Sequence, residues 1–104
     1  MPKKTIVGQL IDVDDEGYLT DFDQWNETIG AELAGQVGID MTDEHWDVIQ
    51  YLRDDYKKRG QTASLRHAST AGGFDVKRLF ELFPCKPAKK MAYIAGLPKS
   101  IGCV

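Results

Sequence analysis

The fold depends above all on the stretch TDEHWDVIQYLRDDYKKRG, residues 42–60, which carries the strongest helix signal in the chain. Thr42 is a favoured N-cap residue, and the acidic residues after it complement the positive end of the helix dipole. The basic run at residues 57–59 suits the last turn, and Gly60 suits the left-handed position at which helices end. The face expected to be buried carries Trp46, Ile49, Arg53 and Tyr56, flanked by Leu52.

Upstream of this stretch, the sequence predicts short strands. Residues 5–13 alternate loosely around Gly8 and indicate one or two of them. The residues expected on their buried side are Ile6, Leu10 and Val13. The run DDEG at 14–17 is a turn signal, after which residues 18–19 can return as a further short strand.

An earlier helix is expected between these strands and residue 42. Asp23 is its expected N-cap, and the helix should fade at Gly35 and Gly38. Its buried face would carry Trp25, Ile29 and Leu33, which are spaced four residues apart.

Two short helices are expected after residue 60. The first covers residues 62–71 and stops at Gly72 and Gly73. Asp75 is placed to cap the second, and Pro84 ends it because proline cannot continue a helix. The apolar stripe of the second helix consists of Val76, Leu79, Phe80 and Phe83.

The last helix is expected over residues 88–95, with Pro87 in its first turn and Gly96 closing it. Together these signals predict an α+β fold: a small N-terminal antiparallel β-meander packed on about five short helices. With 104 residues and a mass of 11.6 kDa, the chain is long enough for one domain with a core and too short for two.

The composition is that of a globular protein, with 42% hydrophobic and 28% charged residues. Its longest apolar runs are far shorter than a membrane-spanning helix, and the first residues lack the apolar stretch of a signal peptide. These features predict a cytoplasmic protein without membrane partners.

Two cysteines and two histidines limit the metal chemistry that is available. Cys85 and Cys103 do not form a C-x-x-C pair, and a structural zinc site needs four ligands. Zinc binding would require both cysteines to converge with His45 and His67, so no metal and no cofactor are expected. The thiols are therefore either inert or redox-active.

Charge is distributed unevenly along the chain. Residues 1–60 contain 14 acidic and 6 basic residues, whereas residues 61–104 contain 2 acidic and 7 basic residues. A basic C-terminal part favours an acidic or anionic partner, although a solvated basic face would have the same composition.

The C-terminal stretch LPKSIGCV at residues 97–104 has no helical period and is predicted to be a mobile arm on a domain of residues 1–96. Extended to Cys103, the arm reaches roughly 20 Å. Gly102 leaves the backbone beside the thiol unobstructed, and Pro98 stiffens the base of the arm. An incidental cysteine on a frayed terminus is the alternative interpretation.

Several stretches resemble one known family. They are FPCKPAK at 83–89, IAGLPK at 94–99 and GCV at 102–104, preceded by DEGYL at 15–19, TDEHWD at 42–47 and YLR at 51–53 with Tyr56. In this order they are similar to the DsrC/TusE family, which comprises the gamma subunit of dissimilatory sulfite reductase and sulfur-relay proteins of tRNA thiolation. The resemblance covers nearly the whole chain.

The resemblance implies a three-stranded meander on about five helices, with an arm whose penultimate cysteine, here Cys103, carries persulfide sulfur. It also implies a second cysteine in sulfite-reductase-type members, eleven positions earlier on the last helix, where this chain has Ala92. This departure points towards a relay member with a single arm cysteine. Cys85 is a possible second thiol for pairing with Cys103, or a semi-buried residue at a helix break. The short link at residues 71–74 lacks a basic insertion that many bacterial members have.

Three functions remain in consideration. The first is a sulfur carrier that exchanges persulfide with donor and acceptor proteins, rather than a free-standing catalyst, with Lys99, Lys89 and Lys90 steering the arm. The second is a gamma or accessory subunit of dissimilatory sulfite reductase. The third is a helix-turn-helix nucleic-acid module over residues 61–83, which a net charge of −3 disfavours.

Overall fold

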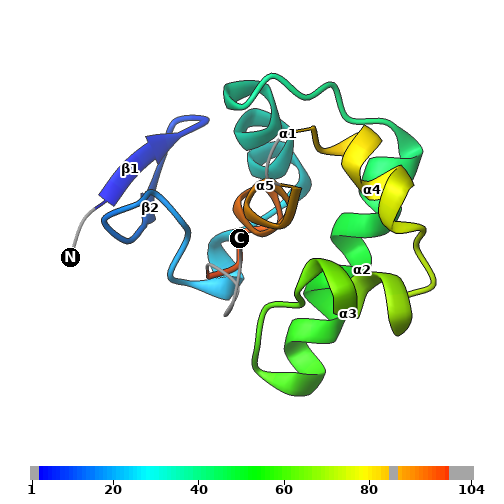
Figure 1. Ribbon diagram of the computed structural model, residues 1–104. Helices are drawn as coiled ribbons and strands as arrows, with labels where there is room; N and C mark the ends of the chain where they lie inside the picture. Colours follow the sequence, from blue (N-terminus) through cyan, green and yellow to red (C-terminus); the bar gives the residue numbers. More distant parts are fainter. Residues whose placement is uncertain (1–2, 85–86, 99–104) are drawn as a thin grey trace.

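The computed structural model describes residues 3–84 and 87–98. Its elements are β1 (Lys3–Ile6), β2 (Gln9–Asp12), the 3-10 turn η1 (Phe22–Gln24), α1 (Glu27–Gln36), α2 (Asp43–Arg59), α3 (Leu65–Thr70), α4 (Val76–Leu82) and α5 (Pro87–Ile94). Figure 1 shows α5 at the centre, with the hairpin to its left, α1 above it, and α2, α3 and α4 to its right. The predicted α+β class is confirmed.

The two strands form an antiparallel hairpin whose last pair is Ile6 with Gln9. Val7 and Gly8 therefore make a two-residue turn, and their φ angles of 50° and 75° match the handedness that such hairpins prefer. The expectation that Leu10 is buried is wrong, since its side chain is 60% exposed and that of Ile11 only 2%. Because successive residues of a strand face opposite sides, Ile11 shares the inner face and Leu10 points outward.

The third strand of the expected meander is reduced to a single bridge between Val13 and Leu19. The turn before it forms as predicted, because the Asp14 side chain accepts hydrogen bonds from the backbone N–H groups of Glu16 and Tyr18, each at 2.9 Å. Within the described residues the sheet thus has two strands extended by one bridge.

Helix α1 begins later than the sequence suggests. Its N-cap is Asn26, whose side-chain oxygen accepts from the N–H of Ile29 at 2.9 Å. The prediction that Asp23 is the cap is wrong, because Asp23 lies inside η1, which Asp21 caps. Ile29 and Leu33 are buried as predicted. The helix ends at Gln36, and Gly38 follows with a positive φ of 76°.

Helix α2 confirms both of its predicted ends, Thr42 as N-cap and Gly60 as a left-handed C-cap. Nδ1 of the buried His45 accepts from the Thr42 backbone N–H at 3.1 Å. Nε2 of His45 lies 2.8 Å from the carbonyl oxygen of Leu82, which can only accept, so Nε2 carries the proton. His45 thus joins the start of α2 to the end of α4, which is a structural role.

The short helices after α2 differ from their predicted extents. Helix α3 begins only after its N-cap Ser64. Asp75 caps α4 as predicted, but Phe80 is 49% exposed and Val76 also faces solvent. The buried stripe of α4 is instead completed by Leu82, because the helix turns Leu82 rather than Phe80 towards α2 and α5.

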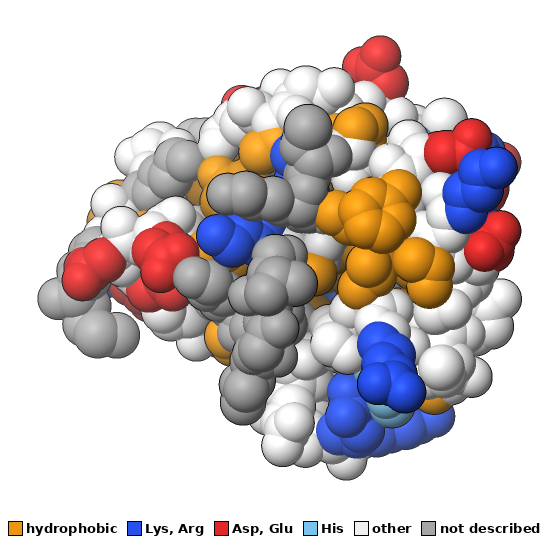
Figure 2. All heavy atoms as spheres, viewed as in Figure 1, with side chains coloured by type: hydrophobic (Ala, Val, Ile, Leu, Met, Phe, Trp, Pro, Cys, Tyr) orange, Lys and Arg blue, Asp and Glu red, His pale blue; other side chains and the backbone are white. Residues whose placement is uncertain are grey.

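The junction of α2 with α3 is held by a buried carboxylate, Asp55. Arg59 Nη2 donates to Asp55 Oδ2 at 2.7 Å, and His67 Nε2 lies 3.2 Å from Oδ1. Figure 2 shows Lys and Arg side chains gathered around a histidine at this end of the molecule. The hydrogen bond from Arg59 is the main reason that the pKa of Asp55 lies below its ordinary value, and His67 adds to the effect.

We expect Asp55→Asn to lower the free energy of unfolding by about 2 kcal/mol at neutral pH, as hydrogen bonds to charged groups typically contribute. Because the pKa of Asp55 is lower in the folded state, its contribution is complete above the unfolded value of about 3.9 and is lost as the pH falls further. Urea unfolding at pH 3 and pH 7 measures this, with Asp54→Asn on the exposed face of α2 as the control. A stability gap that is equally large at pH 3 would contradict the prediction.

Candidate functional site

The last helix, α5, starts with Pro87, whose missing N–H costs nothing in the first turn. One face of α5 is buried and consists of Pro87, Ala88, Met91, Ala92 and Ile94. Lys89 and Lys90 lie outside this buried face and are half-buried. Lys90 Nζ donates to the carbonyl oxygen of Pro84 at 2.5 Å, which ties α5 to the end of α4.

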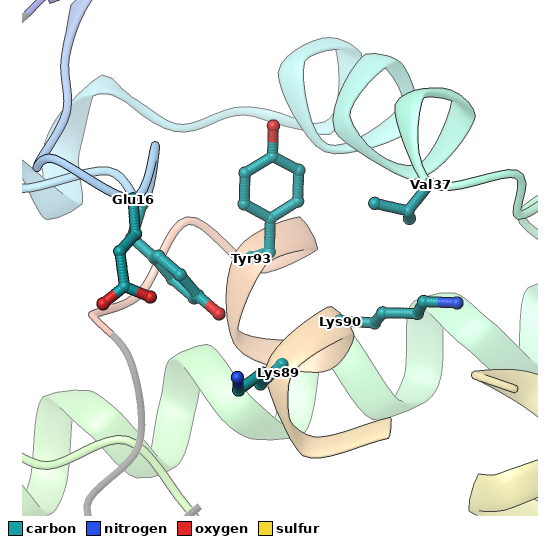
Figure 3. A pocket seen from close by; sticks show the side chains of 6 residues that line it. Glu16, Val37, Lys89, Lys90 and Tyr93 are labelled. Carbon is teal, nitrogen blue, oxygen red and sulfur yellow. The ribbon is translucent and has the colours of Figure 1, made fainter. Parts of the chain in front are cut away.

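An open pocket of about 290 Å³ lies beside α5 and is lined by Glu16, Tyr18, Val37, Lys89, Lys90 and Tyr93. Figure 3 shows Glu16 on one side of α5 and Val37 on the other, with the two lysines and Tyr93 projecting from α5 between them. The Tyr93 hydroxyl donates to Gln36 Oε1 at 2.7 Å, and its ring meets that of Tyr18 edge to face. Two ammonium groups against one carboxylate give this pocket a net positive charge.

The end of α5 is held by the guanidinium group of Arg53, which is only 9% exposed. Its Nη1 donates to the carbonyl oxygen of Ala95 at 2.7 Å, and its Nη2 donates to that of Phe22 at 2.8 Å. The guanidinium carbon lies 3.8 Å from the ring centre of Phe22 and 4.2 Å from that of Trp25. Burial lowers the pKa of Arg53, and the two carbonyl groups and two aromatic faces compensate for its lost hydration.

Trp25 fits between two glycines. A Cβ atom at Gly30 would lie 2.8 Å from Cζ2 of the indole, and a Cβ atom at Gly96 would lie 2.4 Å from Cδ1. The indole Nε1 donates to the carbonyl oxygen of Ile94 at 2.7 Å. Trp25 and Arg53 thus hold two consecutive carbonyl groups at the end of α5, and Gly96 provides the space they need. We call Trp25, Arg53 and Gly96 the α5 clamp.

Beyond the clamp, the described chain stays attached to the domain through two more residues. Leu97 is fully buried, with 0% exposure, and its N–H donates to the carbonyl oxygen of Ala92. The carbonyl oxygen of Pro98 accepts a hydrogen bond from Thr62 Oγ1 at 2.7 Å. The first two residues of the expected arm, Leu97 and Pro98, are therefore anchored to the domain.

Of the predicted site residues, the structure places Lys89 and Lys90 together on the pocket side of α5. Cys103, Cys85, Lys99 and Gly102 lie outside the described residues. Ala92, the position at which the resemblance implies a second cysteine, has its side chain buried in the core.

The described residues also bear on metal binding and membrane insertion. They contain no group of three or more His, Cys, Asp and Glu side chains arranged to hold a metal ion. Neither do they contain a helix of the length and apolarity that crossing a bilayer would require.

The sequence did not point to the α5 clamp or to Thr62. The spacing of Arg53 from Ile49 places it on the buried face of its helix. A basic residue within an apolar stripe was the only sequence feature that could have indicated the clamp. Arg53 is hydrogen-bonded to Phe22, 31 positions earlier, and to Ala95, 42 positions later. Trp25 is hydrogen-bonded to Ile94, 69 positions later. These separations are beyond the range of any local pattern.

These features define a class of protein: a small α+β domain whose last helix is clamped at its end and continues into a C-terminal segment that carries a cysteine. The family model described as DsrC like protein matches residues 5–104. The chain belongs to this DsrC-like family, which confirms the resemblance seen in the sequence.

Two relatives with known names match nearly the full length of this chain. The gamma subunit of dissimilatory-type sulfite reductase from Nitratidesulfovibrio vulgaris is 38% identical over 105 residues, which cover 100% of both chains. Sulfurtransferase TusE of Escherichia coli K12 is 36% identical over 104 residues, covering 93% of this chain and 95% of TusE.

Solved structures agree with the fold. The NMR structure of Allochromatium vinosum DsrC superimposes with a TM-score of 0.82 at 34% identity, covering 98% of this chain and 97% of that one. A chain in the crystal structure of dissimilatory sulfite reductase I has a TM-score of 0.84 at 36% identity and covers 99% and 100%.

Proposed function

We propose that this chain is a sulfur carrier of a sulfur-relay system, in which Cys103 accepts persulfide sulfur from one protein and passes it to another. The observation that carries the proposal is the family match across residues 5–104, which includes Cys103. The name sulfurtransferase TusE belongs to relatives of nearly equal length, and we extend their activity to this chain.

The proposed reaction is an exchange between a thiol and a persulfide. The Cys103 thiolate attacks the outer sulfur of a donor persulfide, the donor S–S bond breaks, and its electron pair leaves with the donor thiolate. The new S–S bond makes Cys103 a persulfide, and an acceptor thiolate then takes the outer sulfur by the same step. Each step exchanges one thiolate for another, so atoms and electrons balance without an added oxidant or reductant.

The anchored base of the arm supports this function. Pro98 is held at the domain surface by Thr62, and Cys103 follows five residues later. Five extended residues span roughly 17 Å, enough for the thiol to enter the active site of a partner while the domain stays outside.

Positive charge near the arm would favour an anionic partner surface. Lys89 and Lys90 line the pocket beside α5, and we propose that Lys99 acts with them in steering the arm. We propose sulfur donor and acceptor proteins as the partners.

Intact-mass analysis after incubation with glutathione persulfide tests the proposal. We expect wild type and Cys85→Ser each to gain one sulfur atom, about 32 Da, in a form that dithiothreitol removes. Cys103→Ser should gain none. Because Cys85→Ser removes the other thiol of the chain, it is the matched control. If Cys103→Ser still gained the sulfur atom, or if Cys85→Ser gained none, Cys103 would not be the sulfur-carrying residue.

The second candidate function is a gamma or accessory subunit of dissimilatory sulfite reductase. It is favoured by the 38% identity to such a subunit over its full length. Ala92 argues against a complete dissimilatory cycle. A disulfide or trisulfide with Cys103 would need a second thiol at position 92. Co-purification of the tagged chain with a sulfite reductase from its native host would establish this function, and its absence would leave the relay role.

Nucleic-acid binding has less support. Arg78, a basic residue within the segment 61–83 that the helix-turn-helix hypothesis concerns, donates to both carboxylate oxygens of Glu44 at 2.5 and 2.6 Å. An arginine engaged in this way would have to give up its carboxylate partner before it could bind a phosphate.

A further inference from the structure

The contact between Thr62 and Pro98 is the last anchor of the described chain. We propose that Thr62 is a positioning residue for the segment that carries Cys103: by holding the carbonyl oxygen of Pro98, it fixes the point to which residues 99–103 are joined. This role rests on the proposed function, because it concerns the presentation of Cys103 to a partner.

The end of the described chain is fixed to an unusual extent. Of the five residues from Ile94 to Pro98, three have a carbonyl oxygen that accepts a hydrogen bond from a distant side chain. The donors come from three different places in the sequence: Trp25 before α1, Arg53 on α2, and Thr62 between α2 and α3. These three contacts attach the segment from Ile94 to Pro98 to three separate parts of the domain.

The segment that carries Thr62 is itself fixed on both sides. Gly60 ends α2 in the left-handed conformation, with its N–H bonded to the carbonyl oxygen of Tyr56 at 2.7 Å. Ala63 is buried in the core, and the Ser64 hydroxyl caps α3. The corner between α2 and α3 therefore presents the Thr62 hydroxyl from a defined position.

Thr62 differs from the α5 clamp in its surroundings. Arg53 is buried and Trp25 packs against the core, whereas Thr62 is partly exposed. Removing its hydroxyl group opens no cavity, so the contact with Pro98 can be removed without disturbing the core.

Fixing Pro98 would help the transfer of sulfur in two ways. A tether that starts from a held residue has fewer conformations to lose when a partner captures its end. The thiol is also kept within a smaller volume, which raises its effective concentration at a site the domain has docked beside.

The test compares Thr62→Val, which removes the hydrogen bond at nearly constant volume, with Thr62→Ser, which retains the hydroxyl group. The first readout is amide hydrogen exchange at Leu97, whose N–H bonds to Ala92 just before Pro98. We expect Thr62→Val to speed this exchange about fivefold, the factor that corresponds to one neutral hydrogen bond of about 1 kcal/mol. Exchange at Ala95, further inside the clamp, should remain unchanged, and Thr62→Ser should behave as wild type.

The second readout is the footprint of a nitroxide label on Cys103, measured as paramagnetic broadening of domain amides in a Cys85→Ser background. We expect Thr62→Val to spread the broadening over more of the domain, with a melting temperature within a few degrees of the parent. Faster exchange with an unchanged footprint would make the contact merely structural and overturn the proposal, as would no change in either readout. Both readouts are independent of sulfur transfer. The positioning role of Thr62 can therefore be refuted while the Cys103→Ser experiment supports the sulfur-carrier function, and the sulfur-carrier function can be refuted while the role of Thr62 is supported.

Discussion

Gly96→Ala should lower the free energy of unfolding by about 3 kcal/mol, because the added methyl group clashes with Trp25. A Cβ atom at position 96 would lie 2.4 Å from Cδ1 and 2.8 Å from Cγ of Trp25. The indole cannot retreat, because Gly30 lies against its other edge and its Nε1 is bonded to the carbonyl oxygen of Ile94. Overpacking of this kind typically costs 1–3 kcal/mol.

Backbone strain adds to the clash. Gly96 has a φ of 70°, where a side chain costs roughly 1–2 kcal/mol. For a chain of this size, a loss of 3 kcal/mol lowers the melting temperature by roughly 12 to 24 °C, which calorimetry would measure.

Gly60→Ala is the matched control for this variant. Gly60 has the same φ of 70°, but a Cβ atom there would meet nothing within 4 Å. We therefore expect it to show the cost of backbone strain alone, about 1 kcal/mol. Equal losses in Gly96→Ala and Gly60→Ala would show that the contact with Trp25 does not require the glycine.

Arg53→Met, on α2, should lower the free energy of unfolding by about 3 kcal/mol. The substitution leaves the carbonyl oxygens of Ala95 and Phe22 without their donor, and each unsatisfied buried group costs roughly 1–3 kcal/mol. It also removes the stacking of the guanidinium group on Phe22 and Trp25. Removing a buried charge offsets part of this loss, since burial penalises the charged form of Arg53.

Two further variants separate charge from geometry. Arg53→Lys keeps the charge but replaces the planar fork with a single ammonium group, which cannot span two carbonyl groups in this way, so we expect a similar loss. Arg66→Met, at an exposed arginine of α3, should change stability by less than about 0.5 kcal/mol. Denaturant unfolding measures all three, and full stability of Arg53→Lys would show that charge alone holds the clamp.

The two largest effects thus fall at one place, the end of α5. Trp25 packs against the hydrophobic core, and Trp25 and Arg53 also hold the carbonyl groups of Ile94 and Ala95, which precede the segment that carries Cys103. In a sulfur carrier of the proposed kind, the stability of this region and the presentation of Cys103 would be linked.

The sequence determined the features that depend on neighbours along the chain. The cap residue Thr42 and the stop residue Gly60 fixed both ends of α2, and Asp75 and Pro87 located the starts of α4 and α5. These signals work locally, because each satisfies or removes backbone groups within a few residues. The motifs along the chain likewise sufficed to identify the family.

Only the tertiary structure decided which surfaces those elements bury and how the segment after α5 is anchored. It turned Phe80 towards solvent, buried Leu97, and joined Thr62 to Pro98 across 36 positions. The α5 clamp has the same origin, since Arg53 reaches the carbonyl oxygen of Ala95 only when α2 packs against the end of α5. Local patterns set where a helix begins and ends, but contacts between distant segments depend on how the finished elements pack, which no short stretch of sequence encodes.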